Sequence, residues 1–280
     1  METYLRGDKI NRIFVKGNRI KRLYLKGNLI YNGEDLDKLI FKIDTTIAGT
    51  SGVGNFALPG RGSGNNYTVE WGDGTSSTHT GTSATHNYST PGVYTCKISG
   101  TFRGFGFAAA GDRLKLIELL NEGNTGLDTN QYAAFRGCEN LSICLFSFDS
   151  VTNCSYMFNN CTSLASLPMA TFDSVTNCDN MFAGCTSLAS LPMATFDNAT
   201  NCNTMFNNCS NLTSLPLAIF DNATSCNYMF NNCSSLTGLP LATFNNADSC
   251  NVMFSNCSNL TSLPLATFNN ATIFFNAFQG

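Results

Sequence analysis

The sequence predicts a mainly β protein with short helices, made of an N-terminal β-meander, a β-sandwich and a C-terminal solenoid of about seven 24-residue rungs. Three stretches predict it in turn: a repeat of about ten residues, a Gly-, Ser- and Thr-rich stretch with short β-prone runs, and a longer repeat. The longer repeat places one leucine in the same position of each unit: Leu164, Leu188, Leu212, Leu236 and Leu260. We expect domain boundaries at 1–40, 41–108 and 109–280.

The first 33 residues read RGDKINRIFV, KGNRIKRLYL and KGNLIYNG after a short start. A glycine precedes Asp or Asn in each unit, which favours hairpin turns between apolar residues that alternate in the chain. Both faces of such a small sheet are partly apolar, so we expect a partner to cover one, either a host assembly or another copy of the chain. The segment carries eight Arg or Lys against two acids, and the expected attachment residues are Arg12, Lys16, Arg19, Lys21, Arg22, Tyr24 and Lys26.

Residues 41–108 favour short strands around the single tryptophan, Trp71, which we expect in the core of the sandwich. Asp73-Gly74 and Pro91-Gly92 are turn signals beside the β-prone runs. We interpret Asp73 as a turn residue rather than a calcium ligand, because calcium needs several oxygen ligands.

Each rung contains two different spacings of apolar residues, one after the other. Cys178, Met181, Phe182 and Cys185 have the spacing of one helical face, and Leu188, Leu191 and Met193 have the spacing of a short strand. We therefore predict a strand, a turn and a two-turn helix for each rung. So short a helix needs packing against neighbouring rungs, which predicts that the rungs stack. Phe274, Phe275 and Phe278 are expected to cap the last rung, with an adhesive end as the alternative.

Two segments resemble known families. Glu70-Trp71-Gly72-Asp73-Gly74-Thr75, followed by HNY and PGVYT, resembles the polycystic-kidney-disease (PKD) type of immunoglobulin-like domain. The rungs resemble BspA-type leucine-rich repeats, and Val151–Phe158 is the best copy, although cysteine replaces the usual methionine at the start. Chains that join these two modules are surface or adhesion proteins of bacteria and of their phages, so the resemblance implies such a role.

Thirteen cysteines are present, ten of them in C-x6-C pairs. Disulfides between rungs are one interpretation, but we favour buried thiols that act as small apolar side chains. With only two histidines in the chain, a zinc site is not expected. The N-terminus lacks the apolar stretch of a secretory signal, so we expect folding in a reducing cytoplasm.

No combination of residues predicts catalysis, a cofactor or a phosphate loop, so we do not expect an enzyme. No apolar run predicts membrane insertion, and no DNA-reading element or basic-aromatic platform predicts nucleic-acid binding. Residues 137–280 contain seven acids and no Lys or Arg. The sequence therefore favours a binding function, carried out through a flat, uncharged surface.

The expected binding face consists of residues that alternate with the buried leucines and point outward. It contains Ser166, Ser190, Ser214 and Ser262, together with Pro168, Pro192, Pro216, Pro240 and Pro264. The alternative is that both sets are merely structural, with each proline ending a strand. Such a face suits a glycan or protein surface on a host cell.

The predicted function is a non-enzymatic virion surface protein of a phage, such as a tail, fibre or head decoration, made in the host cytoplasm. Residues 1–33 would attach it to the particle, and the solenoid would bind the host. The alternative is a BspA-like adhesin on the bacterial cell surface.

Overall fold

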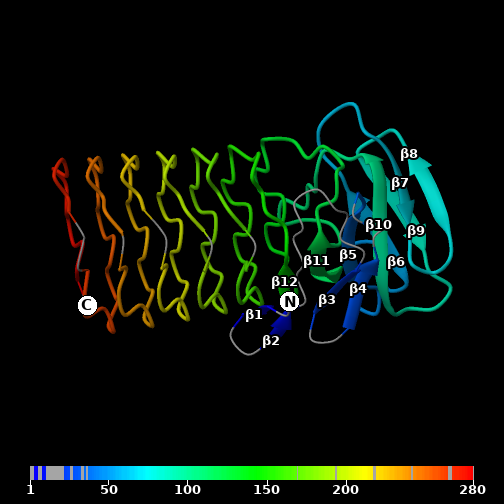
Figure 1. The fold of residues 1–280 in the computed structure, drawn as a ribbon, viewed down its shortest axis with the longest axis horizontal. Helices are drawn as coiled ribbons and strands as arrows, with labels where there is room; N and C mark the ends of the chain where they lie inside the picture. Colours follow the sequence, from blue (N-terminus) through cyan, green and yellow to red (C-terminus); the bar gives the residue numbers. More distant parts are fainter. Residues whose placement is uncertain are drawn as a thin grey trace.

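The structure is a computed structural model of the 280-residue chain. It describes residues 3–5, 8–10, 22–25, 28–32, 35, 37–168, 170–192, 194–216, 219–240, 242–263 and 267–279. These residues form a mainly β protein, as predicted. A β-rich part occupies one end, and a row of stacked turns of the chain leads from it to the C-terminus (Figure 1).

Two small antiparallel pairs form the described part of the N-terminal segment. Strand β1 (Thr3–Leu5) pairs with β2 (Asp8–Ile10), and β3 (Arg22–Leu25) pairs with β4 (Asn28–Asn32). Neither pair joins the larger sheets. The intervening residues 11–21 lie outside the described residues.

A six-stranded sheet forms the centre of the β-rich part, in the order β12-β11-β5-β10-β7-β8. Its strands are β5 (Leu39–Asp44), β7 (Asn66–Glu70), β8 (Ser76–His79), β10 (Val93–Thr101), β11 (Leu116–Asn121) and β12 (Ile143–Cys144). A second sheet pairs β6 (Asn55–Pro59) with β9 (Ser83–Asn87). The two sheets share a core, because Phe41 of β5 lies 6.2 Å from Phe56 of β6, centroid to centroid.

Trp71 is buried in this core, as predicted. Its indole N–H donates to the Ser77 hydroxyl at 2.8 Å, so the buried polar group is satisfied. The His86 ring stacks on the indole with centroids 4.9 Å apart. His86 Nε2 also lies 2.7 Å from the carboxylate of Asp73, which ties the Asp-Gly turn to the core.

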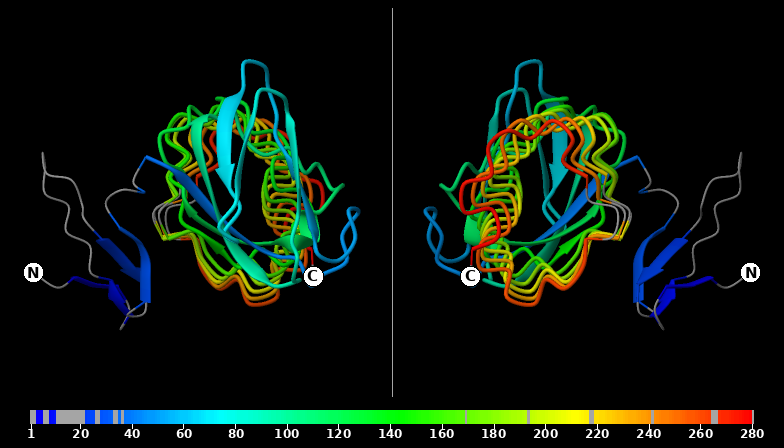
Figure 2. Two further views of the ribbon diagram at one scale, coloured as in Figure 1. Left: turned by 90° about the vertical axis from the view of Figure 1, so that its right-hand side faces the viewer. Right: turned by 90° about the vertical axis from the view of Figure 1, so that its left-hand side faces the viewer.

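The rungs stack in register along the rest of the chain. Isolated parallel bridges join equivalent residues 24 positions apart, as in Asn153, Asn177 and Asn201, and again in Ser166, Ser190 and Ser214. Seen along the row, successive rungs superimpose around a common interior (Figure 2). Phenylalanines fill that interior in columns: Phe182, Phe206 and Phe230 stack with centroids 5.4 Å apart. The described leucine, cysteine, methionine and phenylalanine positions of the middle rungs are buried, as the repeat predicted, whereas Met193, the last residue of the predicted strand motif, lies outside the described residues.

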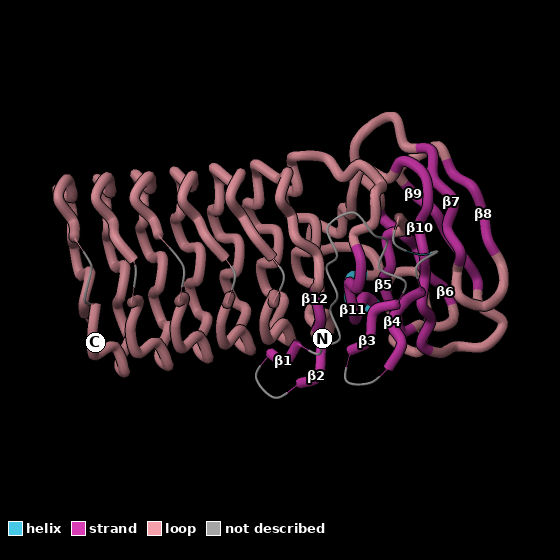
Figure 3. Tube along the Cα trace, in the orientation of Figure 1, coloured by secondary structure: helices cyan, strands magenta, loops and turns pink. Residues whose placement is uncertain are grey.

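The short helices predicted for the rungs are wrong. The described rung residues form turns instead, as the tube in Figure 3 shows, and Arg113–Lys115, directly before β11, forms a 3-10 turn. Alternate backbone N–H groups donate to carbonyls of the next rung rather than along a helix, at Cys178, Asn180, Phe182 and Gly184. Asn180 and Gly184 have φ of 55° and 77°, and such left-handed residues interrupt a helix every four positions.

The β-rich part and the rungs share one sheet and one core. Strand β11 pairs antiparallel with β5 and parallel with β12, whose residues belong to the first rung. Residues 116–121, which form β11, therefore lie in the six-stranded sheet and also pair with the first rung. The sheet continues across the position where a domain boundary was expected, between residues 108 and 109.

At the C-terminal end, Phe278 stacks on Phe254 with centroids 5.3 Å apart. The outer faces of the last phenylalanines remain in solvent: the exposed fractions are 39% for Phe274, 71% for Phe275 and 59% for Phe278. Phe278 thus covers Phe254 of the preceding rung, Phe274 packs on Phe268, and all three rings keep exposed surface in the single chain.

Candidate binding surfaces

The serines of the expected binding face are aligned from rung to rung. Ser166, Ser190 and Ser214 are half-buried, and Ser262 is exposed. Pro168, Pro192 and Pro216 are half-buried and Pro240 is exposed, whereas Pro264 lies outside the described residues. A column of exposed residues lies one residue before the serines, at Ala165, Ala189, Thr213, Thr237 and Thr261. Sequence reasoning missed this column, although its small residues recur as regularly as the serines.

The threonines of this column are oriented by the stack itself. Thr213 donates its hydroxyl to the carbonyl of Ala189 at 3.1 Å, and Thr237 donates to the carbonyl of Thr213 at 3.2 Å. Since the hydroxyl hydrogens are used between rungs, the surface offers oxygen acceptors and small apolar groups to a partner. The column itself carries no charged side chain.

The acidic residues that recur once per rung brace the stack. Thr171 donates its hydroxyl to Asp149, and Thr195 donates to Asp173 in the same way. The side chain of Asn198 reaches the carbonyl oxygen of Asp173 at 2.6 Å. Within the part of the chain that the structure describes, no cluster of three His, Cys, Asp or Glu side chains could hold a metal ion.

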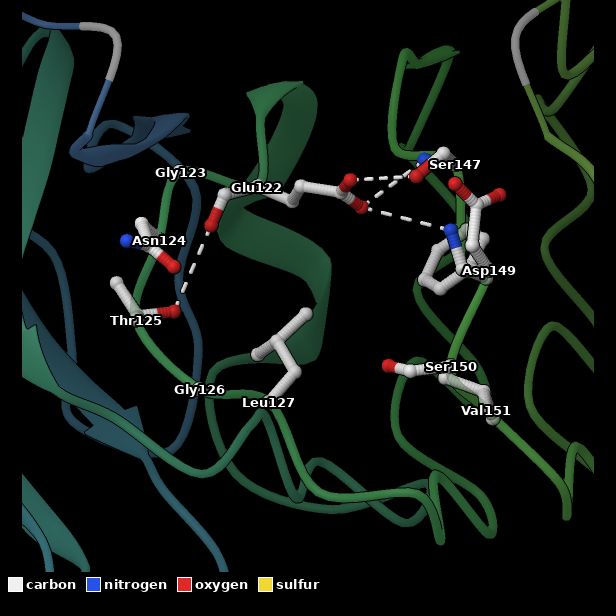
Figure 4. A pocket seen from close by; sticks show the side chains of 11 residues that line it. Glu122, Gly123, Asn124, Thr125, Gly126, Leu127, Ser147, Asp149, Ser150 and Val151 are labelled. Carbon is white, nitrogen blue, oxygen red and sulfur yellow. Dashed lines mark hydrogen bonds between the residues drawn. The ribbon is translucent and has the colours of Figure 1, made fainter.

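A polar cavity of about 220 Å³ lies where the β-rich part meets the first rungs. Glu122, directly after β11, extends across it in Figure 4 and accepts hydrogen bonds from the backbone N–H of Ser147 at 3.0 Å and from its hydroxyl at 2.5 Å. The same carboxylate lies 3.4 Å from the N–H of Phe148, whose φ is 63°. Glu122 therefore holds a left-handed turn of the first rung, and its oxygens are already occupied.

Asp149 also lines this cavity, together with Asn124, Thr125 and Ser150. The cavity joins two segments about 25 positions apart, and neither segment carries a sequence motif. Sequence reasoning missed it for that reason. A second pocket, beside Arg61 and Tyr132, was missed in the same way.

The expected attachment residues fall mostly outside the described residues. Arg22 and Tyr24 belong to β3, where they pair with Asn32 and Leu29 of β4. Arg12, Lys16, Arg19, Lys21 and Lys26 are not among the described residues.

All thirteen cysteines are described, buried and free of disulfides. The second cysteine of each rung has a polar partner: Cys185 Sγ donates to the carbonyl of Phe158 at 3.0 Å, and Cys233 Sγ donates to that of Phe206 at 3.1 Å. Burial raises the pKa of the Cys185 thiol to about 12. These thiols are therefore protonated at neutral pH and act as weak hydrogen-bond donors.

Within the described ranges, no helix has the length and apolar character needed to cross a bilayer. No curated protein and no solved structure matches the chain. A family described as "Mycoplasma protein of unknown function, DUF285" matches residues 129–239 and 176–277. Together the two matches cover the rungs and more than half of the 280 residues. The chain thus belongs to the DUF285 family.

Proposed function

We propose that this chain is a non-enzymatic phage virion surface protein that binds a glycan or protein on the host surface through its rungs. In this proposal the rungs form a leucine-rich-repeat solenoid of the BspA type, and residues 41–108 form a PKD-like β-sandwich that spaces the solenoid from the particle. Residues 1–33 attach the chain to the virion.

The observation that supports this most is the exposed column at Ala165, Ala189, Thr213, Thr237 and Thr261. Its members repeat at the spacing of the rungs and are uncharged, and the stack fixes the orientation of its threonines. A rigid, flat array of small groups suits a large partner surface better than a small molecule. The absence of Lys and Arg from residues 137–280 also avoids non-specific attraction to anionic surfaces.

Immunogold electron microscopy with antibodies against the full chain tests the location. Gold on virions, at tails, fibres or heads, is the expected result. Gold confined to the cell interior would overturn the proposal.

A binding assay on host cells tests the face. The double variant Ala165→Lys, Ala189→Lys places two bulky charges on the exposed column and should abolish binding. Ser174→Lys adds a charge at an exposed position elsewhere on the same rungs and serves as the matched control. Equal binding by both variants would exclude the column as the binding face.

A second candidate function is a bacterial cell-surface adhesin of the BspA kind. The family match favours it, because the family description refers to a cellular bacterium, Mycoplasma. Gold on the cell envelope, and none on virions, is the result that would select this candidate.

A further inference from the structure

An open pocket of about 510 Å³ lies where the segment after β6 meets the first rungs. Its lining is polar except for one aromatic ring, and consists of Arg61, Gly62, Asp128, Asn130, Tyr132 and Asn153. We propose that this pocket binds a neutral saccharide, which stacks on Tyr132 and forms hydrogen bonds with Asp128, Asn130 and Asn153. This site is separate from the exposed column and does not depend on the function proposed for it.

Tyr132 provides a braced aromatic platform. Its side chain is 46% exposed, which is unusual for so large a group. The ring of Tyr156 contacts it edge-on with centroids 5.8 Å apart, and Arg136 lies over Tyr156 with its guanidinium carbon 5.1 Å from the centroid. The negative face of an aromatic ring attracts the slightly positive C–H groups of a sugar. Tyr132 therefore offers a pyranose ring a solvent-facing surface whose position is fixed by the contact with Tyr156.

The asparagines beside the ring are oriented with their donors unused. Asn130 Oδ1 accepts the backbone N–H of Tyr132 at 3.0 Å, and Asn153 Oδ1 accepts that of Ser155 at 3.0 Å. These bonds fix each amide group, while neither Nδ2 has a recorded partner among the described residues. Two fixed donors beside an aromatic ring match the alternating hydroxyl groups of a sugar.

Asp128 supplies the acceptor. Its nearest cation is Arg103, with Nε 3.9 Å from Oδ1, which is too long for a hydrogen bond. The carboxylate can therefore accept bonds from sugar hydroxyls. Gly62 allows it to sit close to the chain, since a Cβ at position 62 would lie 2.5 Å from Asp128 Oδ2.

The charges in the pocket favour a neutral ligand. Arg61 donates from Nη1 to the carbonyl of Asn130 at 2.8 Å and from Nη2 to that of Tyr132. Its two terminal nitrogens therefore hold the backbone under the platform instead of facing a ligand. Asp128 repels a carboxylate or sulfate brought to the same place. An uncharged sugar avoids that repulsion and still uses all three polar side chains.

Saturation-transfer NMR on the full chain tests the inference, with cellobiose, maltose, lactose and diacetylchitobiose as neutral probes and glucuronate as the acidic one. We expect transfer to at least one neutral disaccharide. Tyr132→Ala should weaken that binding about tenfold, since it removes the stacking surface. Tyr228→Ala removes another exposed tyrosine, 44% exposed on a distant rung, and should leave binding unchanged.

Asn153→Asp tests the donor without removing the acceptor. The variant keeps an oxygen for Ser155 and loses only the Nδ2 donor, so saccharide binding should fall while the melting temperature is retained. Asn201→Asp is the matched control, because Asn201 Oδ1 likewise accepts the N–H of Asn203, at 3.2 Å, on a rung outside the pocket.

Three outcomes would overturn the inference: no transfer to any of the four neutral disaccharides, binding of glucuronate alone, or full binding by a folded Tyr132→Ala variant. Saccharide binding that is lost in the Ala165→Lys, Ala189→Lys variant but kept in Tyr132→Ala would place the site on the exposed column. That result would reject this pocket and support the proposed function.

Discussion

The thiol of Cys209 donates a hydrogen bond to the carbonyl oxygen of Phe182 in the preceding rung, with sulfur and oxygen 3.1 Å apart. The same carbonyl oxygen also accepts the backbone N–H of Cys185 at 3.0 Å, so the thiol is a second donor to it, in an interior from which water is excluded. Cysteine is small enough for the position and still supplies a weak donor. The second cysteine of each rung thus gives a buried carbonyl its second hydrogen bond as well as filling space.

We expect the thiols to be free and slow to react. Titration under denaturing, non-reducing conditions should find most of the thirteen cysteines as thiols. In the folded protein, burial raises the pKa of thiols such as Cys209 well above the ordinary value of 9.0, so raising the pH from 7 to 9 should hardly accelerate labelling. Five or more disulfides would contradict both the structure and the expected folding in a reducing compartment.

The two faces of a rung should differ sharply in their sensitivity to mutation. Phe206→Ala removes a ring that stacks between Phe182 and Phe230, and should lower the free energy of unfolding by about 3 to 5 kcal/mol. Ser214→Ala, at a half-buried surface position, should change it by less than about 0.5 kcal/mol. Chemical denaturation measures both, and equal effects would mean that the faces are assigned wrongly.

A buried ion pair joins the segment before β11 to the loop before β6. Lys115 and Asp112 are both fully buried, with Nζ 3.6 Å from the carboxylate, and Lys115 also donates to the carbonyl of Gly52 at 2.6 Å. Lys115→Met leaves the buried carboxylate without its cation, although Ser51 and Ala57 still donate to it, and should cost about 3 to 5 kcal/mol of stability. The double variant Asp112→Asn, Lys115→Met should lose less than the two single variants together, and strict additivity would argue against coupling.

Acid should weaken the Asp-Gly turn. Partial burial alone would raise the pKa of Asp73, but hydrogen bonds from Thr75 and His86 outweigh it and lower that pKa to about 2, from 3.8. Because the folded pKa lies below the unfolded one, this stability is fully present above pH 4 and is lost as the pH falls towards 2. Unfolding measured between pH 5 and 2 should be less pH-dependent in Asp73→Asn. If the unfolding free energy of the variant depends on pH as steeply as that of the wild type, Asp73 does not contribute to the acid sensitivity.

Removal of residues 1–33 should leave the remainder folded and abolish association. The segment carries eight Arg or Lys against two acids, and its β1–β2 and β3–β4 pairs lie outside the larger sheets. We expect loss of co-sedimentation with the particle, or of self-association in light scattering, and an attachment that weakens with added salt. If the truncated chain behaves like the full one in both assays, the segment has only a local supporting role.

The sequence predicted the interior of the rungs better than their backbone. Leucine, cysteine, methionine and phenylalanine recur at positions that are buried, because the repeat itself reports which side chains face inward. The spacing of Cys178, Met181, Phe182 and Cys185 fits a helix, but a series of turns bonded to the next rung satisfies it too. Gly184 signals a left-handed residue, whereas Thr204 and Val252 also have positive φ and give no such signal.

The candidate sites were predictable only where they repeat. The column that includes Ser190 was predicted from the period, whereas the exposed column of its neighbour Ala189 was missed although it has the same period. The pocket at Tyr132 does not, because Arg61 reaches it from about 70 positions away. Glu122 likewise looks like any exposed acid until the structure places Ser147 against it.

The 24-residue register has a consequence for how the gene can change. Each middle rung makes the same contacts to the one before it and the one after it, and neighbouring repeats are nearly alike in sequence. Recombination that removes or duplicates one whole repeat joins surfaces that already fit, whereas a shift by a single residue would turn the interior outward. The number of rungs can therefore vary between strains by whole repeats. Such a change alters the length of the row and leaves the interior of each rung the same.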